Sequence, residues 1–144
     1  YLLPRFPFEK NDKEIYRGMA LDAEGKELRH ILQNGLEVAK SHYENFIAYD
    51  GKEYPAKTKA IYASSWPDQA ETYVLTKANV KNYLPVILHI KKASNRMTVS
   101  IPHDIPPSWI LRVSVLLKVS GVLTWGEVRL RNGNFVFYPY SDNP

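Results

Sequence analysis

The fold class of this chain is indicated by one stretch, WGEVRLRNGNFVFYPY, residues 125–140. Apolar and polar residues alternate on both sides of Asn132-Gly133, a pattern typical of strands that bury one face. Asn-Gly is the pair that two-residue hairpin turns favour, because both turn positions require a positive φ. The stretch therefore predicts two antiparallel strands, 125–131 and 134–140.

Working outward from this hairpin, short β-rich runs predict further strands at 14–19, 59–64, 84–90 and 97–101. Residues 109–119 fit either a helix or a strand, and their valine content favours a strand. Helical spacing predicts a helix over 25–36, a helical turn or two over 38–46, and a helix that starts at Pro67. The expected fold class is α+β, with helices mainly in the N-terminal half and antiparallel strands dominating the rest.

The 144 residues are expected to form one domain, residues 1–144, with an irregular N-terminal arm over 1–13. Pro4, Pro7 and a charged cluster over 9–14 favour this arm. No stretch approaches the roughly 18 uninterrupted apolar residues that a membrane span needs, so we expect no span.

Several kinds of site are excluded or disfavoured by residue type. The chain has no cysteine, which removes disulfides, thiolate nucleophiles and cysteine-based metal sites. Its four histidines do not follow metal-ligand spacing, so no metal is expected. The net charge of +4 comes from scattered Lys and Arg residues, which makes nucleic acid an unlikely partner. Ten tyrosines and three tryptophans lie mostly in strand patterns, where packing explains them better than base stacking does.

Three polar features follow one another along the chain. Arg17 ends a strand as Ile-Tyr-Arg-Gly, Ser64 and Ser65 end a second strand before a helix, and Glu127 lies near the start of the C-terminal hairpin. Each has an ordinary alternative: Arg17 as a turn residue, Ser65 as a helix cap, and Glu127 as a solvent-facing strand residue. In this order, however, they resemble the Arg-Ser-Glu branch of the ADP-ribosyltransferase superfamily, found among bacterial toxins and effectors, over residues 14–138.

The resemblance implies split antiparallel β-sheets and a site that takes NAD as its substrate. Glu127 would be the catalytic residue, because a carboxylate stabilises the oxocarbenium-like state formed when nicotinamide leaves ribose. Arg17 would hold the NAD pyrophosphate or the adjacent ribose. Ser64 would fix the glutamate and the nicotinamide ribose, and Tyr62 and Tyr73 would stack on the nicotinamide or the adenine. The implied function is that of a mono-ADP-ribosyltransferase, a glycosyltransferase-class enzyme that modifies a protein acceptor. The implied location is secreted, or delivered into the cytosol of a target cell.

Two departures from the family pattern keep a second hypothesis open. The family's Ser-Thr-Ser motif reads Ser64-Ser65-Trp66 here, and Trp125 stands where many members carry Glu or Gln two residues before the catalytic glutamate. The alternative is an inactive relative, or an unrelated module that binds a protein or nucleic acid. An enzyme that only consumes NAD, or modifies nucleic acid, is a third possibility.

Overall fold

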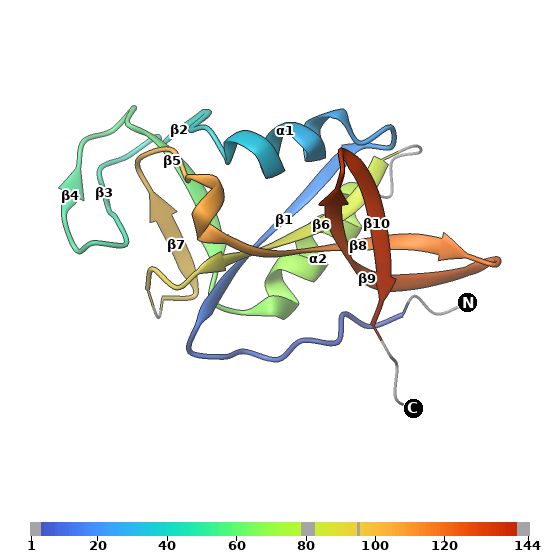
Figure 1. The fold of residues 1–144 in the computed structure, drawn as a ribbon. Helices are drawn as coiled ribbons and strands as arrows, with labels where there is room; N and C mark the ends of the chain where they lie inside the picture. Colours follow the sequence, from blue (N-terminus) through green and yellow to red (C-terminus); the bar gives the residue numbers. More distant parts are fainter. Residues whose placement is uncertain (1–3, 79–82, 95, 141–144) are drawn as a thin grey trace.

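The fold is dominated by one antiparallel sheet, which a computed structural model describes for residues 4–78, 83–94 and 96–140 (Figure 1). The strands are β1 Glu14–Asp22, β2 Lys40–Ser41, β3 Phe46–Ile47, β4 Glu53–Tyr54, β5 Lys59–Ser64, β6 Tyr83–Lys91, β7 Thr98–Ile101, β8 Ile110–Val119, β9 Val122–Arg131 and β10 Asn134–Pro139. The helices are α1 Lys26–Asn34, α2 Pro67–Ala78 and the short 3-10 helix η1 Pro107–Trp109.

The expected α+β class, with helices mainly in the N-terminal half, is wrong. Strands account for 48% of the chain and helices for 17%, with two α-helices. The helical turn expected over 38–46 is replaced by the short strands β2 and β3, because distant partners take its backbone donors. The Val38 N–H donates to Asp104 Oδ1 at 2.9 Å, and the His42 N–H donates to the Thr58 carbonyl at 3.1 Å. Tertiary contacts here override local helical spacing.

The predictions of individual strands, unlike that of the fold class, agree with the structure. The expected strands at 14–19, 59–64, 84–90 and 97–101 correspond to β1, β5, β6 and β7. The ambiguous segment 109–119 is mostly strand, as its valine content favoured. The C-terminal hairpin is confirmed, with φ of 52° at Asn132 and 79° at Gly133.

The strands do not form the split sheets that the resemblance implied. Eight strands make one connected sheet in the order β10-β9-β8-β6-β1-β5-β2, with β7 on β5, and β3 and β4 form a separate pair. β1 and β6 pair over their whole length, from Glu14 opposite Lys91 to Asp22 opposite Tyr83. In contrast, β1 and β5 share a single residue pair, Tyr16 with Ser64. This weakly paired junction is where the candidate site forms.

The two helices cover opposite faces of the sheet, because neighbouring residues of β1 point to opposite sides. Ile15 and Leu21 of β1 pack in one apolar cluster with Leu28 and Ile31 of α1. Tyr16 packs in a second cluster, which contains Ala70 and Val74 of α2. Gly18 lies under α2, and a Cβ there would come within 2.4 Å of the Ala70 carbonyl oxygen. Glycine at this position lets α2 approach β1 closely.

The described part of the N-terminal arm, residues 4–13, packs across the α2 face of the sheet. The Phe6 ring is buried and packs edge-on against Trp125 of β9, with ring centroids 5.0 Å apart. The Phe6 N–H donates to Glu71 of α2 at 2.7 Å, and the Trp125 indole N–H donates to the Pro4 carbonyl at 3.1 Å. The arm therefore links α2 to the C-terminal hairpin.

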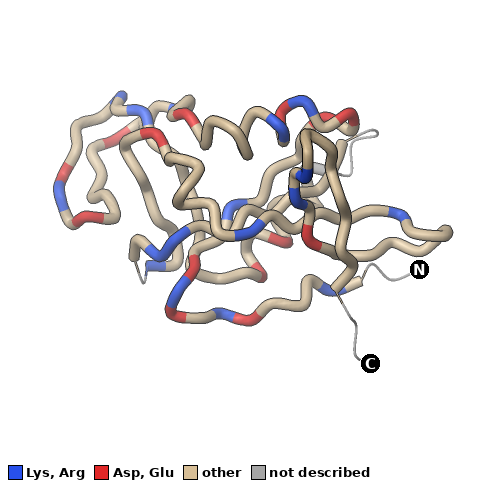
Figure 2. Tube along the Cα trace, viewed as in Figure 1, with Lys and Arg blue, Asp and Glu red and all other residues tan. Residues whose placement is uncertain are grey.

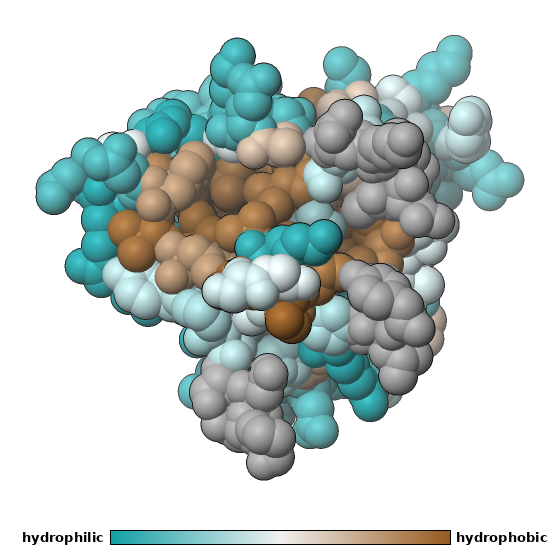
Figure 3. Space-filling model, turned by 90° about the vertical axis from the view of Figure 1, so that its right-hand side faces the viewer, coloured by the Kyte–Doolittle hydropathy of each residue, from teal (hydrophilic) through white to brown (hydrophobic). Residues whose placement is uncertain are grey.

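One side of the molecule leaves apolar surface uncovered by the described residues. The β8–β9 hairpin projects from the body on this side, and Figure 3 shows hydrophobic residues there inside a hydrophilic rim. Val122 near the hairpin tip is 64% exposed. Among the described residues, no helix has both the length and the apolar character that crossing a membrane requires.

Candidate functional site at the junction of β1 and β5

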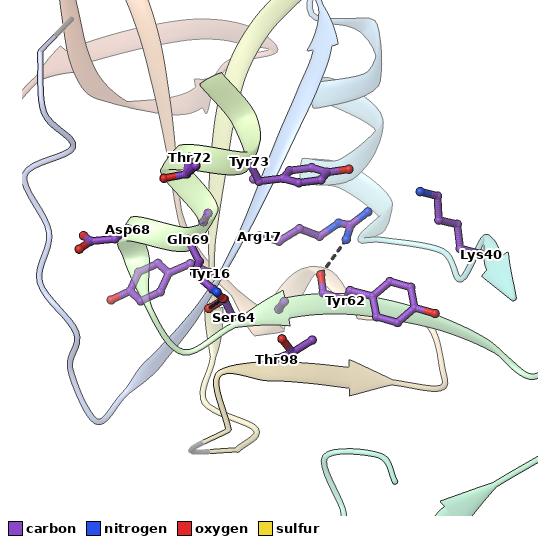
Figure 4. Close-up of a pocket in the computed structure, with 13 residues that line it drawn as sticks. Tyr16, Arg17, Lys40, Tyr62, Ser64, Asp68, Gln69, Thr72, Tyr73 and Thr98 are labelled. Carbon is purple, nitrogen blue, oxygen red and sulfur yellow. Dashed lines mark hydrogen bonds between the residues drawn. The ribbon is translucent and has the colours of Figure 1, made fainter. Parts of the chain in front are cut away.

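A cavity of about 690 Å³ lies where β1 and β5 diverge beyond their single residue pair (Figure 4). Its volume is within the usual range for small-molecule sites. Four of the five predicted site residues line it, together with residues that the sequence did not single out. The predicted four are Arg17, Tyr62, Ser64 and Tyr73.

Arg17 supplies a partly buried positive charge at this cavity. Its Nη1 donates to the Tyr62 carbonyl at 2.7 Å, which bridges the gap that opens between β1 and β5. Its Nε is buried and has no hydrogen-bond partner. Burial lowers the pKa of the Arg17 guanidinium, and no ion pair joins Arg17 to a carboxylate within the described residues. The guanidinium therefore lacks an anionic partner in this part of the chain.

Two tyrosine rings flank the Arg17 side chain. Figure 4 shows Arg17 extending between Tyr73 of α2 and Tyr62 of β5, with Lys40 of β2 facing it from the far side. Tyr73 is 48% exposed, and burial raises the pKa of the Tyr62 hydroxyl. Aromatic faces beside a fixed cation suit a ligand that joins a flat ring to an anionic group.

Ser64 is committed to the start of α2. Its hydroxyl donates to Gln69 Oε1 at 2.9 Å and accepts from the Trp66 N–H at 3.0 Å. Ser65 is not the helix cap that the sequence favoured, since its hydroxyl donates to the carbonyls of Ser94 and Arg96 instead. Ser64 therefore ties the end of β5 to the helix that forms one wall of the cavity.

Glu127 lies outside the cavity. Across the sheet it is opposite Ser114 of β8, which is opposite Ile87 of β6, which is opposite Gly18 of β1. Because directly paired residues point to the same face of a sheet, Glu127 leaves the sheet on the face of Gly18 and α2, with two strands between β9 and β1.

The Glu127 carboxylate is instead paired with two arginines. It accepts from Arg129 Nε at 2.7 Å and lies 3.6 Å from Arg112 Nε. The catalytic role implied for Glu127 stays a prediction, and the carboxylate does not contact the four cavity residues.

Trp125 belongs to the apolar core rather than to a ligand surface. It is only 3% exposed and packs against the arm. Lys40 and Gln69 are among the cavity residues that the sequence did not single out. Lys40 falls in the segment expected to be helical, so no local signal pointed to it. Gln69 lies one turn into α2 and is recognisable only through its bond to Ser64.

A second polar cluster lies on the α2 face beneath the arm. Glu14 accepts from His89 Nδ1 at 3.2 Å, His89 Nε2 accepts from Ser114 at 2.7 Å, and Ser114 accepts from Tyr140 at 2.7 Å. The order acid, imidazole, hydroxyl is that of serine hydrolases. However, His89 and Ser114 are fully buried, and the Phe8 ring lies 4.6 Å from the His89 ring. This arrangement satisfies buried polar groups and leaves no room for a substrate.

No family model, curated protein or solved structure matches this chain. Within the described ranges, no group of three or more His, Asp or Glu side chains is placed to hold a metal ion. The assignment of function therefore rests on the cavity itself.

Proposed function

We propose that the protein binds an anionic ligand with an aromatic ring, of the nucleotide class, in the cavity between β1 and β5. The observation that supports this most directly is the Arg17 guanidinium, which is partly buried, with an unpaired buried Nε and no carboxylate partner among the described residues. NAD is the first ligand to test, because the resemblance implies it.

The energetic argument starts from the cost of burying a charge. An ion taken out of water loses several kcal/mol of solvation unless its partners replace the lost interactions. Here the Tyr62 carbonyl accepts one hydrogen bond from Arg17 Nη1, and Arg17 Nε has no partner. A phosphate or carboxylate in the cavity would restore charge-assisted bonds, which are the strongest that arginine makes.

The aromatic part of the ligand would lie against Tyr73 or Tyr62. Both rings are at the cavity wall, and Tyr73 is about half exposed. Lys40, also exposed, adds a second positive charge across the cavity from Arg17. A nucleotide fits this combination better than a simple anion does, because it offers a ring to the tyrosines as well as a phosphate to the two cations.

ADP-ribosyl transfer to a protein acceptor is the second candidate function. It is favoured by the meeting of Arg17, Ser64, Tyr62 and Tyr73 at one cavity. The reaction also needs a carboxylate at the ribose. The cavity's own carboxylate among the described lining residues, Asp68, is exposed and points away from Arg17 in Figure 4. Glu127 does not line the cavity and is paired with Arg112 and Arg129, so binding is better supported than catalysis.

The test is calorimetric titration with NAD, ADP and adenosine, comparing the wild-type protein with Arg17→Gln and Glu127→Gln. We expect Arg17→Gln to weaken ADP and NAD binding by roughly tenfold or more, the scale of a hydrogen bond to a charged group. Glu127→Gln should leave binding unchanged. The affinity for adenosine, which lacks phosphate, should change little in Arg17→Gln. Absence of binding by all three ligands, or equal binding by Arg17→Gln, would refute the proposal.

The transferase candidate is tested separately by nicotinamide release from NAD, followed by mass spectrometry of partner proteins. Turnover lost in Glu127→Gln, with NAD binding retained, would support catalysis and require Glu127 to reach the cavity in the active state. Binding without turnover would leave the protein as a nucleotide binder.

A further inference from the structure

A cationic surface lies on the C-terminal hairpin, away from the cavity. It consists of Arg112 on β8, Arg129 and Arg131 on β9, and Tyr138 on β10, with Glu127 among them. Arg112 and Arg129 thus pair with one carboxylate, and Arg131 lies beside the Tyr138 ring. Figure 2 shows the basic positions of β9 following the acidic one along the strand. We call this set the hairpin arginine face.

The arginines of this face are held in place before any partner arrives. Glu127 contacts both Arg129 and Arg112, and its hydrogen bond with Arg129 raises the pKa of the Arg129 guanidinium. The guanidinium groups of Arg129 and Arg131 lie 5.0 Å and 5.7 Å from the Tyr138 ring centroid. Side chains fixed in this way lose less conformational entropy on binding.

The spacing of the arginines suits an extended chain. Arg129 and Arg131 are two residues apart on one strand, so they point to the same face about 6.5–7 Å apart. Alternate side chains of an extended peptide repeat over the same distance. In addition, β10 is the last strand in the sheet order of the described residues, so its outer edge is open to an added strand.

We propose that the hairpin arginine face binds an acidic, extended segment of a partner protein, whose alternate carboxylates pair with Arg129 and Arg131. Charge complementarity carries this assignment. A single-stranded nucleic acid fits less well, because its bases need free aromatic faces, and the ring of Tyr138 already has guanidinium groups beside it. The proposal is independent of the cavity and of its ligand.

The test is fluorescence anisotropy with three labelled probes: an alternating Glu-Thr decapeptide, its Gln-Thr counterpart, and a ten-nucleotide oligothymidylate. The test variant is Arg129→Gln with Arg131→Gln. The matched control is Lys52→Gln with Lys92→Gln, which removes the same charge from exposed positions outside the face. Thermal unfolding of each variant verifies its fold.

We expect the Glu-Thr peptide to bind the wild-type protein more tightly than either other probe does. The arginine variant should weaken that binding roughly fivefold or more, the scale of two exposed charge pairs, and the lysine variant should change it less than twofold. Equal weakening in both variants would mean that net charge alone attracts the peptide. Tighter binding of oligothymidylate would mark a nucleic-acid surface. Either result, or no peptide binding at millimolar concentration, would overturn the proposal.

Discussion

Arg17 has two roles with opposite effects on stability: it is a candidate ligand-binding residue, and it connects β1 to β5. A partly buried guanidinium without an anion costs stability in the ligand-free protein, whereas its hydrogen bond to the Tyr62 carbonyl helps hold β1 to β5. Replacing a buried charge by an apolar side chain of similar length is often neutral or stabilising. The effect of replacing Arg17 on the free energy of unfolding therefore shows whether the residue serves ligand binding or the stability of the fold.

We predict that Arg17→Met leaves the free energy of unfolding of the ligand-free protein unchanged or raises it by up to about 1 kcal/mol. The same change should abolish nucleotide binding. Urea denaturation followed by tryptophan fluorescence measures the first quantity and calorimetry the second. A loss of stability well above 1 kcal/mol would instead identify Arg17 as a structural bridge between the two strands.

The individual site residues were predictable from sequence to different degrees. Ser64 was predictable because it ends the apolar run of β5. Arg17 was expected at the end of a strand, but it lies within β1, next to the residue that pairs with Ser64. The position of Glu127 relative to Arg17 and Ser64 could not be predicted from the sequence. A strand's pattern shows which residues share a face, but the side of the sheet on which that face lies depends on the register of β6, β8 and β9.

Among the elements, α2 is the part of the fold that determines the shape of the cavity. It supplies Gln69 and Tyr73 to the wall, and its distance from β1 depends on Gly18. The sequence predicted the start of α2 at Pro67 but not this close approach. The signal for the close approach was Gly18, in the Arg17-Gly18 pair, which was interpreted only as the end of a strand.

We predict that Gly18→Ala lowers the free energy of unfolding by about 1–3 kcal/mol and weakens nucleotide binding. The new Cβ would lie 2.4 Å from the Ala70 carbonyl oxygen and 3.1 Å from Val74 Cβ, so α2 must move outward. Gly126→Ala is the matched control, because its Cβ would overlap the Phe137 ring in the C-terminal hairpin. The control should cost stability and spare binding. Equal binding by the two variants would show that the position of α2 does not matter to the ligand.

The elements predicted incorrectly share a cause. The residues between α1 and β4 form β2 and β3 because they bond to Asp104, Thr58 and other distant groups. Periodicity within a window of ten residues cannot register such partners. This is also why Lys40 was not expected at the site.

At the scale of the whole molecule, the buried cluster beneath the arm couples stability to pH. Glu14 keeps its charge because the hydrogen bond from His89 lowers its pKa from 4.5 to about 2. Burial lowers the pKa of His89 from its usual 6.5. For both groups the unfolded chain binds protons at a higher pH than the folded one. The stability they provide is therefore complete near neutral pH and is lost on acidification.

We predict that the free energy of unfolding begins to fall below about pH 6.5, through His89, and falls further between pH 4.5 and 2, through Glu14. In Glu14→Gln the second decrease should be smaller by roughly 1–2 kcal/mol, allowing for solvent screening. Denaturation curves across this pH range measure it. The exposed Glu24→Gln serves as the control, and a wild-type profile in that variant is expected. An unchanged profile in Glu14→Gln would exclude the cluster as the source of acid sensitivity.

The single residue pair between β1 and β5 has one more consequence. β5 carries β2 and β7 with it, so this part of the sheet is joined to β1 through Tyr16–Ser64 and the Arg17 bond to Tyr62. A ligand that binds Arg17 and contacts Tyr62 would add a further connection between β1 and β5 at this junction. Ligand binding would then be measurable as slower exchange of the amide hydrogens along the whole of β5 and β7.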